Sequence, residues 1–263
     1  MKSNIKIAII NQLSDNYSYI IYSLNEKKAL IVDPAESLTL INFLEDHNLS
    51  LHSILITHHH SDHTSGIMGI KKKYNISIYS PNNNIEGTTN IIKDSEQINL
   101  GFINFDVIST PGHTIDHVIY YCEKEKLLFS GDTLFYYGCG RVFEGTIEQM
   151  LTSLKKIIKL PDETNVYCGH EYTYKNLEFL LDELVISPDK GAIKAKCRNL
   201  IKKNGSSMPF NLGHQKSWNP FLNCDDVHYK QGIAGFYKNE GKIRIDATEL
   251  EFFTFIRQKR NDY

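Results

Sequence analysis

The chain has 263 residues, of which 41% are hydrophobic, so it can bury one large core or a core with a smaller second domain. Its 29 lysines and arginines nearly balance its 31 aspartates and glutamates, which argues against a surface built to bind nucleic acid. No apolar run approaches the roughly 18 residues that a membrane helix needs, so we expect no membrane partner.

The cysteines and the N-terminus favour a cytoplasmic protein. The chain has 5 cysteines, an odd number, and they are scattered without a C-x-x-C pair. This argues against a disulfide framework and favours a reducing compartment. The apolar run at residues 5–10 is interrupted by Lys6 and is not followed by a small-residue cleavage site. We therefore interpret it as a strand and not as a signal peptide.

Two series of strands are predicted in the first two thirds of the chain. The first series, with helices at 36–48 and 65–74, has strands at 5–10, 17–24, 28–33, 53–56 and 76–80. The second has strands at 96–100, 103–109, 117–122, 126–130 and 166–168. Thr146 and Gln149 have the spacing of a capping box, which predicts a helix that ends before Pro161. This order indicates two β-sheets faced by helices.

Helical signals dominate after His170. We expect helices at 173–185, 189–203 and 246–260, with loops within 205–213 and 232–241. Asp246 is the predicted cap of the last helix, whose Phe253 and Ile256 would pack inward. The change of pattern predicts a catalytic domain at 1–170 and a helical domain at 171–263.

The densest group of metal-binding side chains follows the predicted strand at 53–56. Residues 57–66 read T-H-H-H-S-D-H-T-S-G and contain His58, His60, Asp62 and His63. Imidazole nitrogens and carboxylate oxygens suit zinc, iron and manganese. In an extended loop, His58, His60 and Asp62 would face one side, His59 would face the scaffold, and the adjacent Asp62 and His63 would diverge. One ion could hardly bind all four side chains, whereas a pair of ions could.

Three further candidate ligands also follow predicted strands, namely His113, Asp132 and His170. We expect one ion to be held by His58, His60 and His113, a second by Asp62, His63 and His170, and both by a bridging Asp132. Each ion would keep an open position, as catalytic sites require. Two ions that share a water can lower its pKa to near 7, so the expected reaction is hydrolysis of a carbonyl or phosphoryl ester.

Two neighbours of these ligands have open interpretations. His117 lies on a predicted strand near the site and either supports a ligand or is an ordinary buried histidine. Cys168 precedes His170 by two residues and is an alternative thiolate ligand, although the nitrogen and oxygen donors already suffice.

The ordered motifs T-H-H-H-S-D-H-T-S-G, T-P-G-H-T, G-D-T-L-F and C-G-H-E-Y-T resemble those of the metallo-β-lactamase superfamily. The stretch C-G-R-V-F-E-G-T and the helical C-terminal part most resemble glyoxalase II, the hydroxyacylglutathione hydrolases. The resemblance implies an α/β fold, an αββα sandwich followed by a small helical domain. It also implies two divalent metal ions, with zinc expected and iron or manganese as alternatives, and it implies that Asp62 orients the attacking water.

The same resemblance implies a substrate. The expected reaction is hydrolysis of S-(R)-lactoylglutathione to D-lactate and glutathione, the second step of methylglyoxal detoxification. Separately from the resemblance, we expect a monomer. The implied glutathione-binding residues are Arg141, Phe143, Tyr172, Arg257 and Arg260. Arg141 and Arg260 stand where lysine is usual, and Phe143 stands where tyrosine is common, so these positions bear on thiol specificity.

Three other functions are weighed against this one. A persulfide dioxygenase of the same fold uses one iron and would not need Asp62, His63 and His170 as a second set. A nuclease of the same fold would be expected to carry a basic surface, which the charge balance does not favour. A binding or scaffold protein would be expected to have lost ligands, and all seven are present.

Overall fold

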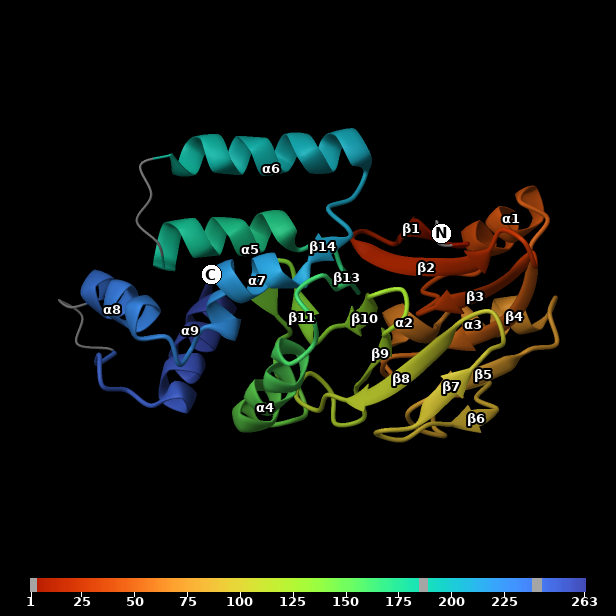
Figure 1. Ribbon diagram of the computed structural model, residues 1–263, viewed down its shortest axis with the longest axis horizontal. Helices are drawn as coiled ribbons and strands as arrows, with labels where there is room; N and C mark the ends of the chain where they lie inside the picture. Colours follow the sequence, from red (N-terminus) through yellow and green to blue (C-terminus); the bar gives the residue numbers. More distant parts are fainter. Residues whose placement is uncertain (1–3, 185–188, 238–242) are drawn as a thin grey trace.

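The computed structural model describes residues 4–184, 189–237 and 243–263, and it shows two β-sheets with helices around them (Figure 1). The first sheet contains, in spatial order, β1 (Ile5–Gln12), β2 (Asn16–Ser23), β3 (Lys28–Val32), β4 (Ser50–Leu55), β5 (Ser77–Ser80) and β6 (Asn90–Ile91). The second contains β14 (Phe210–Asn211), β13 (Asn165–Cys168), β10 (Leu127–Gly131), β9 (Val118–Cys122), β8 (Asn104–Ser109) and β7 (Gln97–Asn99). A short hairpin of β11 (Leu134–Phe135) and β12 (Gly138–Cys139) stands apart from both.

Helices lie between the strands and after them. The described helices are α1 (Leu38–Asp46), α2 (Ser61–Thr64), α3 (Ile67–Lys71), α4 (Ile147–Ile158), α5 (Thr173–Phe179), α6 (Lys190–Asn204), α7 (Leu212–Trp218), α8 (Val227–Phe236) and α9 (Glu249–Asp262). A π-helical turn, Leu180–Leu184, continues α5, and a 3₁₀ turn, Pro220–Leu222, follows α7.

Alternating side chains on the central strands explain why the sheets stack. In β3, Leu30 and Val32 enter the core that the two sheets share, whereas Ala29 and Ile31 enter a second core against α1 and α3. Successive side chains of a strand point to opposite faces, so a strand that is apolar on both faces must be covered on both. The prediction of two sheets faced by helices is therefore confirmed.

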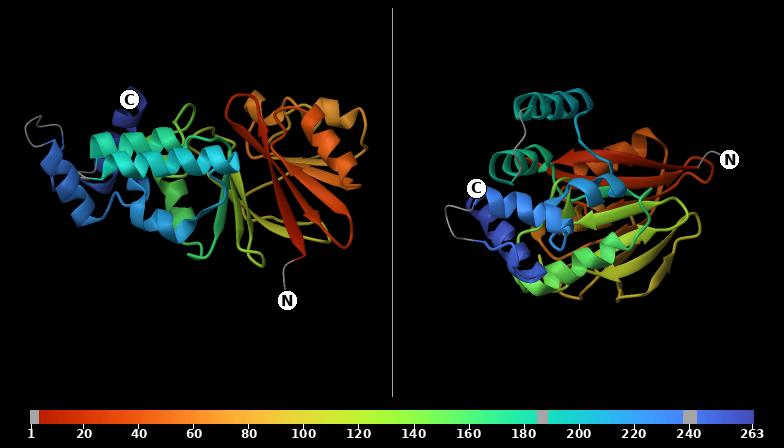
Figure 2. Two further views of the ribbon diagram at one scale, coloured as in Figure 1. Left: turned by 90° about the horizontal axis from the view of Figure 1, so that it is seen from above. Right: turned by 60° about the vertical axis from the view of Figure 1, so that its left-hand side comes forward.

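The C-terminal helices gather at one end of the sandwich, as the two views in Figure 2 show. There α9 buries Phe252, Phe253 and Ile256, and α4 buries Met150, Leu154 and Ile157, all within the core that the sheets share. The predicted capping box is present, since Thr146 Oγ1 accepts from the Gln149 N–H at 3.1 Å. The predicted inward packing of Phe253 and Ile256 is also confirmed.

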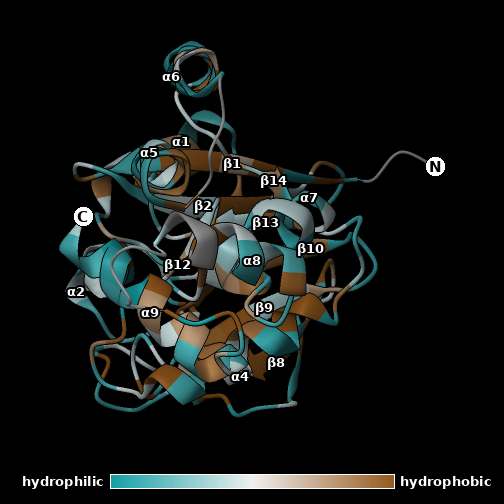
Figure 3. Cartoon of the chain, turned by 90° about the vertical axis from the view of Figure 1, so that its left-hand side faces the viewer, coloured by the Kyte–Doolittle hydropathy of each residue, from teal (hydrophilic) through white to brown (hydrophobic). Residues whose placement is uncertain are grey.

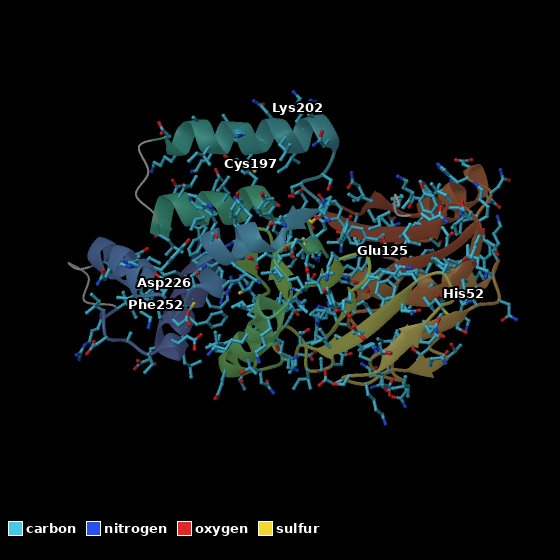
Figure 4. The ribbon with its side chains drawn as sticks, in the orientation of Figure 1. His52, Glu125, Cys197, Lys202, Asp226 and Phe252 are labelled. Atoms are coloured by element: carbon cyan, nitrogen blue, oxygen red, sulfur yellow. The ribbon has the colours of Figure 1, made fainter. Side chains whose placement is uncertain are left out.

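Helix α6 is the outermost element and buries none of its side chains. Figure 3 shows it at the edge of the molecule, above the rest of the chain. In Figure 4, Cys197 lies on the side of α6 that faces α5, and Lys202 lies on the far side. Ion pairs from Lys194 and Lys190 to Asp182 connect this helix to the body, at 2.5 and 3.3 Å.

Several predicted boundaries are wrong. The helix at 65–74 is only α3, and the last helix begins later than expected because Thr248, not Asp246, caps it with Glu251. The loop expected within 205–213 is present at 205–209, before β14 and the start of α7, whereas α8 occupies the first part of the range 232–241, in which a second loop was expected. The last residue of the helix predicted at 173–185 and residues 238–241 of the range 232–241 lie outside the described residues.

Candidate metal centre

The seven predicted ligands converge at one rim of the sandwich. His58 and His60 follow β4, and His113 lies in the turn between β8 and β9. Asp132 follows β10 directly, and His170 follows β13. Asp62 and His63 lie in α2. Strand ends that are far apart in the sequence therefore place all seven side chains together.

The loop after β4 is extended only as far as His60. The ψ angle of His60 is 143°, and α2 begins at the next residue. The first turn of this helix is closed by the His63 N–H, which donates to the His60 carbonyl at 3.0 Å. The expectation of an extended chain through Asp62 is therefore wrong. Because of this helical turn, Asp62 and His63 converge, with His63 Nε2 at 3.7 Å from Asp62 Oδ2.

One cluster consists of His58, His60 and His113. His60 Nδ1 lies 3.1 Å from His58 Nε2 and 3.1 Å from His113 Nε2. Burial, followed by repulsion from His63, holds the pKa of His58 well below its ordinary value, and burial also lowers the pKa of His60. Both rings are therefore neutral at neutral pH, which is the form that binds a metal.

The second cluster consists of Asp62, His63 and His170. His63 Nε2 and His170 Nε2 are 3.3 Å apart, and His170 Nε2 lies 3.4 Å from Asp62 Oδ2. A hydrogen bond from His170 is the largest cause that lowers the pKa of Asp62. Asn16 donates to the same carboxylate at 2.9 Å and fixes its orientation.

Asp132 joins the two clusters. Its Oδ2 lies 3.3 Å from His113 Nε2 and 3.3 Å from His170 Nε2. Its Oδ1 is 3.6 Å from His63 Nε2 and, although buried, has no hydrogen-bond partner among the described residues. The preceding Gly131 has φ +46°, and a Cβ there would lie 2.7 Å from His117 Nε2, so glycine is required.

Oxygen atoms that contact Nδ1 of the histidine rings leave Nε2 facing the ligand clusters. The Arg141 carbonyl lies 2.8 Å from His113 Nδ1, and since a carbonyl only accepts, Nε2 keeps the lone pair. Asp33 and Asp15 accept from Nδ1 of His63 and His170 at 3.0 and 2.9 Å. Such oxygen partners are typical of metal-binding histidines, and they were not predicted from the sequence. The V-D-P stretch at 32–34 was the available signal for Asp33.

The two neighbouring histidines have supporting positions. Asp132 donates its backbone N–H to His117 Nε2 at 3.0 Å, so His117 holds the residue that joins the clusters. His59 turns away from the clusters as expected and lies between Asp116 and Glu144, at 2.9 and 3.0 Å. Cys168 is buried, its thiol donates to the His170 carbonyl, and burial raises its pKa well above the ordinary value, which disfavours a thiolate ligand.

These clusters fit two divalent cations. Zinc ligands at about 2.0–2.1 Å on tetrahedral corners lie about 3.3 Å apart, close to the nitrogen separations in both clusters. The unpartnered Asp132 Oδ1 also favours a cation, because a buried carboxylate oxygen needs a partner. Gly169 leaves the necessary room, since a Cβ there would lie 2.2 Å from that oxygen.

A cavity of about 500 Å³ opens from the clusters toward α5 and α9. All five predicted substrate-binding residues line it, namely Arg141, Phe143, Tyr172, Arg257 and Arg260. Arg257 is only 4% exposed and donates to the Cys139 carbonyl at 2.7 Å. Lys175 and Asn176 also line the cavity and were missed, although Lys175 follows Tyr172 by one helical turn, which was the available signal.

Comparisons with known proteins agree with this geometry. Residues 13–170 match the family model of the metallo-beta-lactamase superfamily, and residues 171–263 match the hydroxyacylglutathione hydrolase C-terminus. ETHE1 from Myxococcus xanthus has the same fold, with a TM-score of 0.66, 20% identity, and coverage of 95% of this chain and 89% of that one. The BLEG-1 B3 metallo-beta-lactamase superposes with a TM-score of 0.61 and 25% identity, over 83% of this chain and 99% of that one. The fold and the ligand clusters thus define a metallo-β-lactamase superfamily protein.

Curated relatives narrow this class. The hydroxyacylglutathione hydrolase of Bartonella tribocorum is 36% identical over 255 residues, 95% of this chain and 96% of that protein. The hydroxyacylglutathione hydrolase of Photobacterium profundum is 37% identical over 256 residues, 97% of this chain and 98% of that protein. The chain belongs to the hydroxyacylglutathione hydrolase family.

Proposed function

We propose that this chain is a metal-dependent thioester hydrolase that converts S-(R)-lactoylglutathione to D-lactate and glutathione, the second step of methylglyoxal detoxification. The carrying observation is one cavity that is lined both by residues of the two ligand clusters and by four cationic side chains. A glutathione thioester is neutral at its reacting carbonyl and anionic at its ends, so it matches both parts of the cavity. The relatives named for this activity cover nearly the whole chain.

We assign the metal ligands as the geometry groups them. His58, His60 and His113 would hold one divalent ion, Asp62, His63 and His170 a second, and Asp132 both. Zinc is the proposed metal, with iron or manganese as alternatives, because nitrogen and carboxylate donors accept all three. When bound, the ions would polarise the thioester carbonyl and lower the pKa of a water between them.

The residues of the chain prepare the site for this chemistry. Asp62 is held by Asn16 at 2.9 Å and stays ionised, so it can accept a hydrogen bond from the attacking water and orient it. His117 holds the backbone of Asp132 and thereby its carboxylate. The thiolate is a good leaving group, so no general acid is required.

We propose that substrate binding depends on the cavity between residues 1–170, the catalytic domain, and residues 171–263, the helical domain. The two family models meet at this boundary, which supports the division. Arg257 and Arg260 come from the helical domain, whereas Arg141 and Phe143 come from the catalytic domain. Tyr172 stacks on His170 with ring centroids 4.8 Å apart and planes 4° apart, so it would bring the thiol carrier beside the ligand clusters.

The second cluster favours hydrolysis over a persulfide dioxygenase reaction, which uses one iron. Asp62, His63 and His170 have their ligand atoms within 4.8 Å of one another, an arrangement that a single-iron enzyme would not need. We also propose a cytoplasmic monomer. All five cysteines are free in the described structure, which supports a reducing compartment, and none of its helices could span a bilayer.

The test is a substrate panel with metal analysis. Purified protein should hydrolyse S-lactoylglutathione in preference to coenzyme A thioesters and should carry two divalent ions per chain. With glutathione persulfide it should consume no oxygen. A preparation that binds a single iron and consumes oxygen with the persulfide would contradict the proposal.

A further inference from the structure

Four cations line the cavity without an ion-pair partner. They are Arg141, Lys175, Arg257 and Arg260, and no described carboxylate forms an ion pair with any of them. Elsewhere in the described chain, lysines such as Lys194 and Lys216 are paired with aspartates at 2.5 Å. The carboxylates that line the cavity, Asp15, Asp62 and Asp132, lie on the side of the ligand clusters. The cavity therefore offers more positive charge than one carboxylate needs.

Three of these cations form one group. Arg257 donates to the Cys139 carbonyl, Arg260 Nε donates to Asn176 Oδ1 at 3.1 Å, and Arg141 Nε donates to Asn261 Oδ1 at 3.2 Å. Burial, followed by repulsion from Arg257 and Arg141, lowers the pKa of Arg260, so the three guanidinium groups act on one another. Guanidinium groups bind carboxylates through paired hydrogen bonds, so this group suits one terminal carboxylate.

Lys175 takes a separate position. It lies on α5, is exposed, and places Nζ at 5.8 Å from the ring centroid of Tyr172, which in turn stacks on His170. Asp15 lines the same cavity and contacts His170, the ring on which Tyr172 stacks. Only one oxygen of the Asp15 carboxylate has a described donor, the His170 Nδ1–H at 2.9 Å. The Tyr172 side of the cavity therefore offers one positive and one negative group.

Glutathione has two carboxylates at opposite ends, and only its γ-glutamyl end also carries an ammonium group. We propose that Lys175 binds the γ-glutamyl carboxylate, that Asp15 faces the neighbouring ammonium group, and that the three arginines bind the glycine carboxylate. This assignment rests on the proposed function. It makes Lys175 a specificity-determining residue that binds a part of the substrate other than the reacting carbonyl.

Three lactoyl thioesters separate the two ends of the thiol carrier. The first is S-lactoylglutathione, the second its glycine ethyl ester, and the third S-lactoyl-N-acetylcysteinylglycine, which lacks the γ-glutamyl group. Lys175→Ala should raise KM about three- to fivefold for the first two thioesters, the size of an exposed ion pair, and should leave kcat unchanged. KM for the third thioester should stay at the wild-type value. Arg260→Ala should show the converse, with KM raised for the first and third thioesters only.

Two variants serve as controls. Lys175→Arg keeps the charge, so its KM for S-lactoylglutathione should be close to the wild-type value. Lys196→Ala, on the outermost helix α6, should leave KM and kcat unchanged for all three thioesters. If Lys175→Ala raises KM equally for all three thioesters, or for none, while the wild type hydrolyses them, the assignment of Lys175 is overturned and the proposed function stands. If the metal-loaded wild type hydrolyses none of them, both are overturned.

Discussion

Asp33 Oδ2 lies 3.0 Å from Nδ1 of His63 and accepts the hydroxyl hydrogen of Thr57 at 2.6 Å. Since Thr57 uses its hydrogen on Asp33, its oxygen must accept from His58 Nδ1 at 3.0 Å. One buried carboxylate therefore orients a histidine in each ligand cluster. Both rings are left with Nε2 free to face a cation.

Replacement of this carboxylate should weaken metal binding without touching a ligand. Asp33→Asn keeps the size of the side chain but removes an acceptor oxygen, and loss of such a partner typically lowers metal affinity about 10- to 100-fold. Zinc affinity, measured by competition with a chelator, checks this. Asp225→Asn, an exposed aspartate far from the clusters in the sequence, is the control. Equal affinity in the Asp33 variant and the wild type would contradict the orienting role.

Asp132→Ala should abolish turnover and metal content together. The carboxylate lies 3.3 Å from a nitrogen of each cluster, so its loss would remove a ligand from both proposed metal sites. Metal analysis of the purified variant and its rate with S-lactoylglutathione are the measurements. A variant that retains both metal and activity would exclude Asp132 as the bridging residue.

The two arginines of α9 should differ in their effect on stability. Arg257→Ala leaves the buried Cys139 carbonyl without its donor, which should cost about 1–3 kcal/mol of unfolding free energy as well as raising KM. Arg260→Ala should raise KM with a smaller loss of stability, because Arg260 is itself partly exposed, whereas Arg257 is buried. Thermal unfolding and steady-state kinetics of both variants separate these effects. Equal unfolding temperatures would show that Arg257 does not support α9.

Helix α6 should depend on charge for its attachment. A hydrogen bond from Lys194 is the largest cause that lowers the pKa of Asp182. A carboxyl group with a lowered folded pKa stabilises the fold above its ordinary pKa, and this contribution is lost as pH falls through the lowered value. Amide hydrogen exchange at 190–204, corrected for intrinsic rates, should therefore accelerate in acid. It should also accelerate in about 1 M salt, where the Debye length is about 3 Å.

The matched variant for this helix is Asp182→Asn, which should show the fast exchange at neutral pH and low salt. Its residual exchange should respond less to salt, because only the longer pairs of Lys194 and Arg198 with Glu178 remain, at 4.0 and 3.8 Å. If neither salt nor Asp182→Asn changes the amide exchange rate of α6, then apolar contacts, and not ion pairs, hold the helix in place.

Most of the fold could be predicted because its strands carry local signals. Apolar runs bounded by turn residues identified most strands of both sheets, although β6 and β14 were missed, and the spacing of Thr146 and Gln149 identified the start of α4. The C-terminal boundaries were less accurate because they depend on distant contacts. Asp246 and Thr248 both have capping side chains, and only the folded chain shows that Glu251 pairs with Thr248.

The ligands could be predicted because they cluster in short motifs, whereas their supports could not. Asp15 and Asp33 reach the centre from the ends of neighbouring strands, so the sequence alone does not show that they contact His170 and His63. The helical turn at Ser61 was also missed, because a histidine-rich loop has no periodicity that predicts α2. Lys175 became a cavity residue only when α5 was placed beside the clusters.

The most direct test of the account is a zinc titration of metal-free protein, with hydrolysis of S-lactoylglutathione followed at each ratio of zinc to chain. Two clusters that share Asp132 predict that activity rises until two zinc ions are bound per chain and then stays constant, with one D-lactate formed for each thioester lost. Full activity with one ion per chain, or an intact thioester with two ions bound, would contradict it.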